Sequence, residues 1–530
     1  MSYEPKEIYG DRDGALLKIS VKKVAAQYQP EAAVEFVVED IKLVSSYNWL
    51  DAGDDRDDIP VIQVPGAPPL VDFPLDQNIL KVEPDNGHHY IDQNAARMKG
   101  RPSLLPGLAA CYAYNKDFRV EDYDVITDRN NLIKLFEILK LEGMDETSKP
   151  RVSNPWNRGP SRVMAGRGRG RGQFSHSRSS SESFRQRNVR NMTMINRREQ
   201  NSRIDIDIIS GYDIRTGEYQ YGLSKDHGTM ILTRWEEKTE EIIDPDVDFR
   251  GFGFSFLAKT RKFLSLDGKR FCEKGPDQVT GYHCLIEYKL CGLKMLVRYH
   301  ADGCDMSREE FLEWVAQDEA SIREKDNTGG MEKGKSHTTE SENGNPDDEE
   351  DEDEDAIQES DTFDLLDSFK TLSITPKDNM EGKELDNVEG KKPEIPLNDP
   401  VPSRLPLKVV RTSTSLFPER RLLQVKTRSK VSGIGREKLY TQLFFSQTKN
   451  FFIAYHIKGR FDKVDARVEN VAPHIRQWGM QNGSVLERLA KLLREIKETS
   501  STLGSKAAIV WTGKEENSET ELSLFARRSE

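Results

Sequence analysis

The sequence predicts a mixed α/β fold in which a central sheet with flanking helices is interrupted by two disordered insertions. Alternation of apolar and polar residues, typical of strands, recurs along the 530-residue chain. Apolar spacing typical of helices lies between these stretches. Residues 151–203 and 325–403 have compositions that cannot bury a core. We therefore expect one domain built from three parts, residues 1–150, 204–324 and 404–530, rather than independent domains in a row.

The first part combines strands, a loop and helices. Residues 14–50 contain two alternating stretches, LLKISVKK and AAVEFVVEDIKLV, which predict strands. Residues 51–90 are rich in proline and aspartate and are expected to form an ordered loop. Residues 103–113 and 130–140 are predicted helices. The second of these carries an apolar face with spacings of three and four, made of Leu132, Leu135, Phe136 and Leu139.

The middle part is predicted to form two strands, a helix and a hairpin. The strands are RIDIDIISGYD and HGTMILTRWEE, and the helix spans residues 249–264, FRGFGFSFLAKTRKFL. The segment GYHCLIEYKLCGLKMLVRYHADGCD predicts a β-hairpin that turns near Cys291 and Gly292.

The last part opens with a short buried strand, residues 422–425, that leads into Lys426. A helix, EKLYTQLFFSQT, and a strand, FFIAYHIKGRF, are predicted to follow. A further helix is expected over residues 485–497, with Ser484 and Glu487 forming a capping box at its start. Two strands, AAIVWT and ELSLFA, complete this part.

Charge is concentrated in the two insertions, although the whole chain carries a net charge of −12. Residues 151–203 hold 13 arginines, no lysine and 2 glutamates, and include GRGRGRG at 166–172. Arg167, Arg169 and Arg171 are candidate RNA contacts, because arginine binds phosphate and stacks on bases. Residues 347–355 are nine consecutive acids. That run is expected to be a solvated spacer, or to bind the arginine tract or a protein partner.

Other bulk properties limit the compartment. Five cysteines without a CxxC pair disfavour a disulfide framework or structural zinc and favour a reducing nuclear or cytoplasmic location. The N-terminal residues are polar, and no apolar run reaches the length of a membrane span, so no membrane association is expected.

The hairpin and the strand before Lys426 suggest one site. Residues two apart in a strand share a face, so His300 and Asp302 point the same way, as do Gln424 and Lys426. If residues 285–302 and 421–426 form adjacent strands of one sheet, Asp302, Gln424 and Lys426 converge at its end. Acids there would hold Mg²⁺, and the lysine would orient or deprotonate the attacking water.

These segments resemble the decapping and 5′-end exonuclease family of the PD-(D/E)XK nuclease superfamily. TDRNNLIKLF, with Arg129 and Lys134, is similar to the helix that carries that family's WRG-like motif. GFSFL at 253–257, His300-Ala301-Asp302 and Gln424-Val425-Lys426-Thr427 follow in the family's order. The chain is similar, further, to uncharacterised fungal proteins with the segments SYNWLDA, VPGAPPL, YIDQNAAR and TDRNN, present here at 46–52, 64–70, 90–97 and 127–131. The resemblance implies a PD-(D/E)XK nuclease-like sheet flanked by helices.

Three positions depart from the family pattern. Leu257, His300 and Gln424 stand where the resemblance implies metal-binding acids, and Asp302 alone is acidic. The expected function is therefore RNA binding at 5′ ends without efficient hydrolysis, with no cofactor, through Arg129 and a degenerate catalytic set of Asp302, Lys426 and Gln424. The alternatives are an active Mg²⁺-dependent RNA decapping or 5′-end hydrolase, with Asp302 as metal ligand, and a non-enzymatic scaffold for protein partners.

Simpler interpretations remain open for each residue. The simpler interpretation of Asp302 is a strand-end or turn carboxylate, that of Lys426 is a solvated lysine, and that of Arg129 is a structural ion pair to Asp124 or Asp128. DDRDD at 54–58 matches the diphosphate-binding motif of prenyl synthases. It lies in a predicted loop and has no second, helix-borne copy, which disfavours that activity.

Overall fold

The computed structural model describes the chain outside the two insertions and several shorter segments. The described residues are 12–26, 38–50, 59–73, 78–142, 201–221, 228–247, 250–264, 271–272, 279–328, 405–412, 415–431, 435–512 and 521–528. The arginine-rich tract up to residue 200, the acidic run and DDRDD lie outside them.

A large mixed sheet forms the centre of the molecule. Its 11 described strands run, in spatial order, β1 (Arg12–Ser20), β23 (Glu521–Arg527), β22 (Lys506–Thr512), β8 (Asn201–Ile209), β11 (Thr229–Arg234), β7 (Val125–Asp128), β16 (Leu293–His300), β15 (Val279–Leu290), β2 (Val38–Leu50), β3 (Val61–Val64) and β18 (Lys408–Arg411). All three expected parts of the chain contribute strands to it. The β15–β16 hairpin turns at Cys291 and Gly292, as predicted, and both residues have positive φ.

A second sheet of 8 described strands lies beside the first. Its order is β14 (Phe271–Cys272), β13 (Arg261–Leu264), β4 (Leu70–Val71), β17 (Gly303–Cys304), β19 (Leu422–Ser429), β20 (Asn450–Ile457), β21 (Arg460–Asn470) and β5 (Ile79–Lys81). Two short ribbons add β9 (Gly211–Asp213) with β10 (Glu218–Gln220), and β6 (Gly87–Tyr90) with β12 (Glu240–Ile243).

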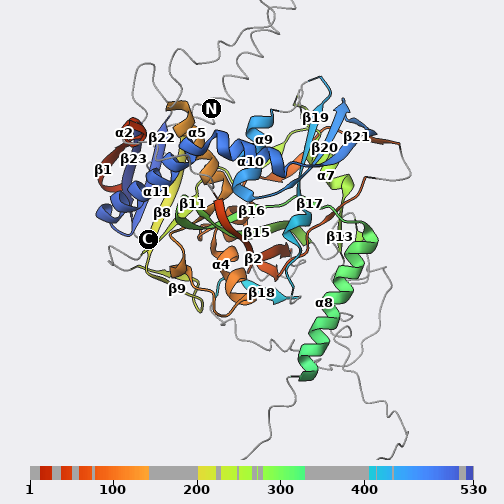
Figure 1. The fold of residues 1–530 in the computed structure, drawn as a ribbon, viewed down its shortest axis with the longest axis horizontal. Helices are drawn as coiled ribbons and strands as arrows, with labels where there is room; N and C mark the ends of the chain where they lie inside the picture. The colour runs from red at the N-terminus through yellow and green to blue at the C-terminus, as the bar shows by residue number, and fades with distance from the viewer. Residues whose placement is uncertain are drawn as a thin grey trace, which may run out of the picture.

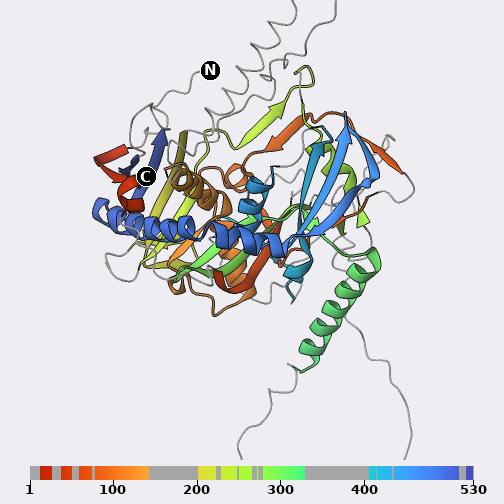
Figure 2. The ribbon, with the colours of Figure 1, turned by 45° about the horizontal axis from the view of Figure 1, so that its top comes forward.

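Helices cover both faces of the large sheet. The described helices are α2 (Val21–Ala26), α3 (Gln93–Met98), α4 (Leu105–Tyr114), α5 (Arg129–Glu142), α7 (Gly253–Thr260), α8 (Arg308–Thr328), α9 (Arg436–Ser446), α10 (Ala472–Gln481) and α11 (Gly483–Leu503), with 3-10 turns at Val120–Asp122 and Glu419–Arg421. Helix α4 packs on β2, β3, β15 and β18, whereas α5 packs on β7, β11 and β16 and contacts α9 and α11. Helix α8 projects away from the rest of the described chain (Figure 1, Figure 2).

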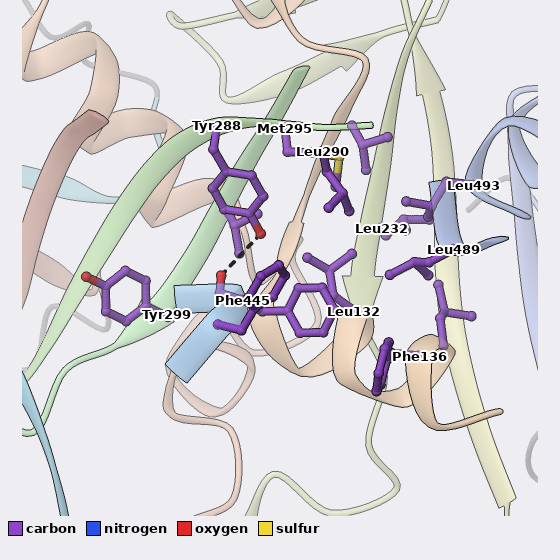
Figure 3. Packing of buried hydrophobic residues seen from close by; sticks show 14 of the residues in the cluster. Leu132, Phe136, Leu232, Tyr288, Leu290, Met295, Tyr299, Phe445, Leu489 and Leu493 are labelled. Atoms are coloured by element: carbon purple, nitrogen blue, oxygen red, sulfur yellow. Dashed lines mark hydrogen bonds between the residues drawn. The ribbon is translucent and has the colours of Figure 1, made fainter. Parts of the chain in front are cut away.

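Two apolar cores follow from the alternation along the strands. In β16, Met295 and Val297 point into the core beneath α5, and Leu296 points into the core beneath α4. The predicted apolar face of α5 is buried in the first core, where Leu132 and Phe136 lie close to Phe445 of α9 and Leu489 of α11 (Figure 3). In the same core, the Tyr288 hydroxyl donates a hydrogen bond to the Phe445 carbonyl at 3.2 Å.

The expectation that residues 285–302 and 421–426 are adjacent strands of one sheet is wrong. Strand β16 ends at His300 in the large sheet, and β19 lies in the second sheet. The chain crosses between the sheets at residues 301–304, where β17 pairs antiparallel with β19. The Asp302 amide donates to the Leu423 carbonyl at 3.1 Å, so the two segments still meet at the site.

Several element boundaries also differ from expectation. Residues 51–90, expected to be loop, contain β3 to β6, because these strands of two to four residues pair with distant segments that local composition does not reveal. The predicted helix 249–264 ends at Thr260 and continues as β13. Residues 21–26 form α2 rather than strand. The first insertion ends before residue 203, because β8 starts at Asn201 and Arg203 pairs with Asp205 at 2.6 Å.

The predicted capping box at the last helix is absent. Helix α11 begins at Gly483, which puts Ser484 inside its first turn, and the preceding Asn482 donates its side-chain amide to the Trp478 carbonyl. A reciprocal capping box forms instead at the start of α8. The Ser307 hydroxyl accepts a hydrogen bond from the Glu310 amide at 3.1 Å, and the Glu310 carboxylate accepts one from the Ser307 amide at 2.8 Å. Helix α8 continues to Thr328, so the second predicted insertion starts later than residue 325.

Candidate nucleic-acid pocket

A cavity of about 460 Å³ lies at the carboxyl ends of β7 and β16. These neighbouring strands are parallel, so the residues that follow them meet at one edge of the sheet. The other walls come from the β6–α3 segment, from α7 with the start of β13, and from the beginning of β15. The lining residues are His88, His89, Tyr90, Ile91, Asp92, Gln93, Asn94, Asp128, Arg129, Asn130, Arg234, Phe254, Leu257, Arg261, Thr280, Gly281, His283, Arg298, Tyr299, His300 and Asp302.

A buried ion pair supports one wall of the cavity. Arg298 donates from Nε and Nη2 to the two carboxylate oxygens of Asp128, at 2.7 and 3.0 Å. Burial alone would lower the pKa of Arg298, but Asp128 reverses this effect and raises it. Both residues are largely buried, so the pair is a fixed structural element and neither charge is available to a ligand.

Two other arginines in the cavity lack such partners. Arg129 opens α5 directly after β7, and its Nε and Nη1 atoms are buried without a hydrogen-bond partner. Arg261 opens β13 directly after α7, and its Nε atom is in the same situation. Burial lowers the pKa of Arg129 to about 10 and also lowers the pKa of Arg261. Both groups remain cationic at neutral pH, so two side chains that line the cavity carry positive charge and unsatisfied donors.

The N-terminus of α5 adds to this positive field. Arg129 and Asn130 of its first turn line the cavity, and the first turn contains no acidic residue. Unpaired backbone amides and the helix dipole make such a terminus favourable for an anion.

Asp302 lies in the same cavity and is already engaged. Its Oδ2 atom accepts a hydrogen bond from the Val425 amide at 2.8 Å, and its Oδ1 atom lies 3.4 Å from Nδ1 of His300. Burial would raise the pKa of Asp302, but the hydrogen bond and charge of His300, together with Lys426, lower it well below its ordinary value. The carboxylate is therefore ionised and partly neutralises the surrounding cations.

The two candidates on β19 occupy different positions. Gln424 is buried, and its amide donates to the His300 carbonyl at 2.7 Å, so it joins the two sheets rather than facing the cavity. Lys426 lies close enough to Asp302 and Arg129 for their charges to act on it, but it is not a lining residue. Burial lowers the pKa of Lys426, and Asp302 opposes that effect.

The residues around Asp302 do not fit a Mg²⁺ site. That ion takes about six hard oxygen ligands, usually with more than one carboxylate. Leu257 supplies no ligand, Gln424 directs its amide group at a backbone carbonyl, and Asp302 is held by Val425 and His300. Over the part of the chain that the model covers, no three side chains of histidine, cysteine, aspartate or glutamate gather in a way that could hold a metal ion.

The opposite wall joins two of the sequence segments noted above. Asp92 caps α3 by accepting hydrogen bonds from the Asn94 and Ala95 amides. The Tyr47 hydroxyl and the Trp49 indole nitrogen, both on β2, donate to Oδ1 of Asn94 at 2.6 and 3.1 Å. SYNWLDA and YIDQNAAR thus build one rigid wall, with Asp92 used in capping.

The structure brings part of the predicted site together. Arg129, Asp302, His300 and Leu257 all line the pocket, and their roles stay predictions. The ion pair suggested for Arg129 is replaced, because Asp128 binds Arg298 and Asp124 accepts the Lys294 amide. Arg261 lies in a predicted helix, residues 88–90 lie in a predicted loop, and residues 91–94 belong to the segment YIDQNAAR, so none of them was expected at the site. Phe263, near the end of the run Arg-Lys-Phe-Leu, favours a strand more than a helix, and this preference could have indicated that the helix ends before Arg261. Arg167, Arg169 and Arg171 lie outside the described residues.

Comparisons with known proteins give one family match and several structural matches. Residues 18–148 match a family described as a domain of unknown function, DUF8563. A search of curated proteins found no match.

Among solved structures, the chain is similar to Rai1 and Dxo1 from fungi. S. pombe Rai1 matches with a TM-score of 0.38 and 11% identity, over 97% of this chain and 100% of that one. Candida albicans Rai1, in complex with pU5-Mn²⁺, matches with a TM-score of 0.37 and 8% identity, over 93% and 91% of the two chains. K. lactis Dxo1, in complex with manganese, gives 0.37 and 8%, over 97% and 98%.

These neighbours are the kind of protein that the motifs resemble. TM-scores below 0.5 at such low identity do not assign an activity to this chain, so its function has to be argued from its own pocket. None of the described helices is both long and apolar enough to cross a membrane.

Proposed function

We propose that the protein binds RNA and holds a 5′-phosphorylated end in this pocket without efficient hydrolysis. The observation that carries the proposal is the pair Arg129 and Arg261, which line the cavity and have buried guanidinium nitrogens without hydrogen-bond partners. Leaving buried charged donors unsatisfied is costly, so a site of this kind is built for an anion that completes them.

The balance of charge in the cavity favours a phosphate. The carboxylates of Asp128 and Asp92 are used by Arg298 and by the start of α3, and Glu236 binds Arg234 and Lys134. Asp302 acts electrostatically on both Arg129 and Arg261, and Asp128, which also acts on Arg129, is already bound by Arg298. The two positive charges therefore exceed the single carboxylate charge that they share. A terminal phosphate offers several acceptor oxygens to two guanidinium groups and to the α5 N-terminus at once.

The same residues argue against efficient hydrolysis. Metal-dependent phosphodiester hydrolysis needs carboxylates that bind the ion and a group that activates water. Here Leu257, His300 and Gln424 occupy the acid positions implied by the resemblance, and Asp302 is bound to Val425. We therefore infer binding as the function, with a Mg²⁺-dependent 5′-end hydrolase as the alternative.

The arginine tract is proposed to supply most of the affinity and the pocket most of the end selectivity. Thirteen arginines without lysine lie in residues 151–203, in a chain whose net charge is −12. Contacts to internal phosphates do not depend on the 5′ end, whereas the pocket has room for only a small group.

The test compares one RNA oligonucleotide with a 5′-phosphate and with a 5′-hydroxyl by fluorescence anisotropy. The ratio of the two affinities cancels the contribution of the arginine tract. We expect the 5′-phosphate to bind about 10-fold more tightly, a modest value for charge-assisted hydrogen bonds. Arg129→Met should abolish the preference. Arg476→Met, which removes an exposed arginine of α10 outside the pocket, is the matched control.

Equal affinity for the two RNA ends in the unmodified protein would contradict the proposal. A preference that survives both Arg129→Met and Arg261→Met would also contradict it, because these two side chains carry the argument. Circular dichroism of each variant shows whether the fold is retained.

A further inference from the structure

An exposed aromatic ring stands at the wall of the pocket. Phe254, in the first turn of α7, stacks on His89 of β6 with ring centroids 3.9 Å apart and planes at 17°. Phe254 remains 41% exposed although His89 packs against it. Phe254 therefore offers a ligand in the cavity an accessible flat apolar face on which to stack.

The ring is held firmly in this position. Asp85 caps the start of α7, with its two carboxylate oxygens accepting hydrogen bonds from the Gly253 and Ser255 amides at 3.0 and 2.9 Å. On the other side, β6 is paired with β12, and Nε2 of the His89 ring donates a hydrogen bond to the Asn86 carbonyl at 2.8 Å. A preorganised ring loses little entropy when a ligand stacks on it.

The same helix also leads to Arg261, one of the two arginines that are proposed to hold the phosphate. Phe254 and Leu257 are three residues apart and therefore share a face of α7. Arg261 follows directly after the helix, and all three line the cavity. The cavity volume of about 460 Å³ lies within the range of sites that hold one small ligand, such as a single nucleotide, rather than a length of strand.

We propose that Phe254, backed by His89, stacks the first nucleobase of the nucleic acid whose 5′-phosphate lies against Arg129 and Arg261. The proposal rests on the proposed function and adds to it the recognition of a base next to the terminal phosphate. Stacking on an aromatic ring tolerates every base, so Phe254 and His89, together called the base shelf, select for the presence of a base rather than for its identity.

The test uses three small probes and the full-length protein in isothermal titration calorimetry. Adenosine 5′-monophosphate offers both groups, ribose 5-phosphate offers only the phosphate, and adenosine offers only the base. We expect adenosine 5′-monophosphate to bind at least about 5-fold more tightly than ribose 5-phosphate, the lower end of the contribution of one stacked base. Phe254→Ala should remove that difference and leave the affinity for ribose 5-phosphate unchanged.

Two further variants make the result specific. Phe254→Trp keeps an aromatic ring and should retain the preference for the nucleotide. Tyr440→Ala removes an aromatic ring that also stacks on a histidine, His474, but lies outside the pocket, and should change nothing.

The outcomes separate the two proposals. Equal binding of adenosine 5′-monophosphate and ribose 5-phosphate would overturn the base shelf and leave the phosphate pocket intact. A preference that Phe254→Ala does not alter would overturn the shelf as well. Failure of both phosphorylated probes to bind would overturn the shelf and the proposed function together.

Discussion

Replacing Asp302 by asparagine tests the interpretation of the pocket most directly. The substitution keeps an oxygen that can accept the Val425 amide but removes the negative charge that faces Lys426, Arg129 and Arg261. Removing one partner from a close buried ion pair costs about 3–5 kcal/mol, which is an upper limit for charges that act over a longer distance. Because 13% of the Asp302 side chain is exposed and one hydrogen bond is retained, we expect a loss of about 3 kcal/mol in the free energy of unfolding at pH 7.

The loss should depend on pH with a definite sign. The pKa of Asp302 is lowered in the folded protein, so its stabilising contribution is present above the unfolded value, which is near 4, and disappears as the pH falls towards the folded value. The difference between the original protein and Asp302→Asn should therefore be full at pH 7 and smaller at pH 3. Urea denaturation at the two pH values measures it, provided that the m-values agree.

Binding provides the second readout of the same variant. Loss of the carboxylate leaves Arg129 and Arg261 less neutralised, so affinity for 5′-phosphorylated RNA should rise. A fall in affinity that requires a divalent cation would refute this reasoning, because it would make Asp302 a metal ligand. A pH-independent change in stability of less than about 0.5 kcal/mol, the range of ordinary surface substitutions, would refute the structural part. Asp305→Asn, three residues away and outside the pocket, is the control.

Three other results are expected. Deleting residues 151–200, which spares β8, should lower RNA affinity and flatten the dependence of log K on log salt concentration in anisotropy titrations, and an unchanged slope would contradict the role of the tract. The purified protein with Mg²⁺ or Mn²⁺ should hydrolyse capped or 5′-phosphorylated RNA poorly in gel assays, whereas robust turnover abolished by Asp302→Ala would favour the hydrolase alternative. Leu489→Ala, at a fully buried position of α11, should cost about 2–5 kcal/mol in urea denaturation, and a smaller loss would mean that α11 is not part of the main core.

The elements that the sequence predicted well are those whose signal is local and long. The apolar face of α5 and the alternation in the β15–β16 hairpin span many residues, so their period is visible without knowledge of the partner. Strands β3 to β6 are short and pair with distant segments, and their proline-rich context is typical of loops. Composition therefore gave no indication that residues 88–94 form a wall of the pocket.

The junction between the two sheets shows a different limit. Alternation predicted that His300 and Asp302 share a face, and the assumption of adjacent strands brought them near Gln424. Neither could show that the chain leaves one sheet for another between them. The crossing depends on Gly303, because a Cβ atom there would lie 2.4 Å from Val71 Cγ2 and 2.7 Å from the Pro69 carbonyl oxygen. A single glycine in the segment HADGCD does not indicate such a close approach by itself.

The same junction explains why Asp302 differs from the other three positions of the expected acidic set. Its carboxylate accepts a hydrogen bond from the Val425 amide, and its own amide donates one to the Leu423 carbonyl. Asp302 therefore holds β19 against the end of the hairpin through two hydrogen bonds. Gln424 completes the fastening through the His300 carbonyl, and an acid at that position would place a second negative charge beside Asp302 without an N–H to donate. A glutamine at position 424 can therefore make the contact that joins the two sheets, whereas a carboxylate cannot.

Position 257 takes no part in the contacts between the two sheets described above. Leu257 lines the cavity, as Arg261 does. The arrangement is a structural clamp next to a cationic pocket, which is compatible with the proposed binding of an RNA end and lacks the carboxylates that metal-dependent cleavage needs.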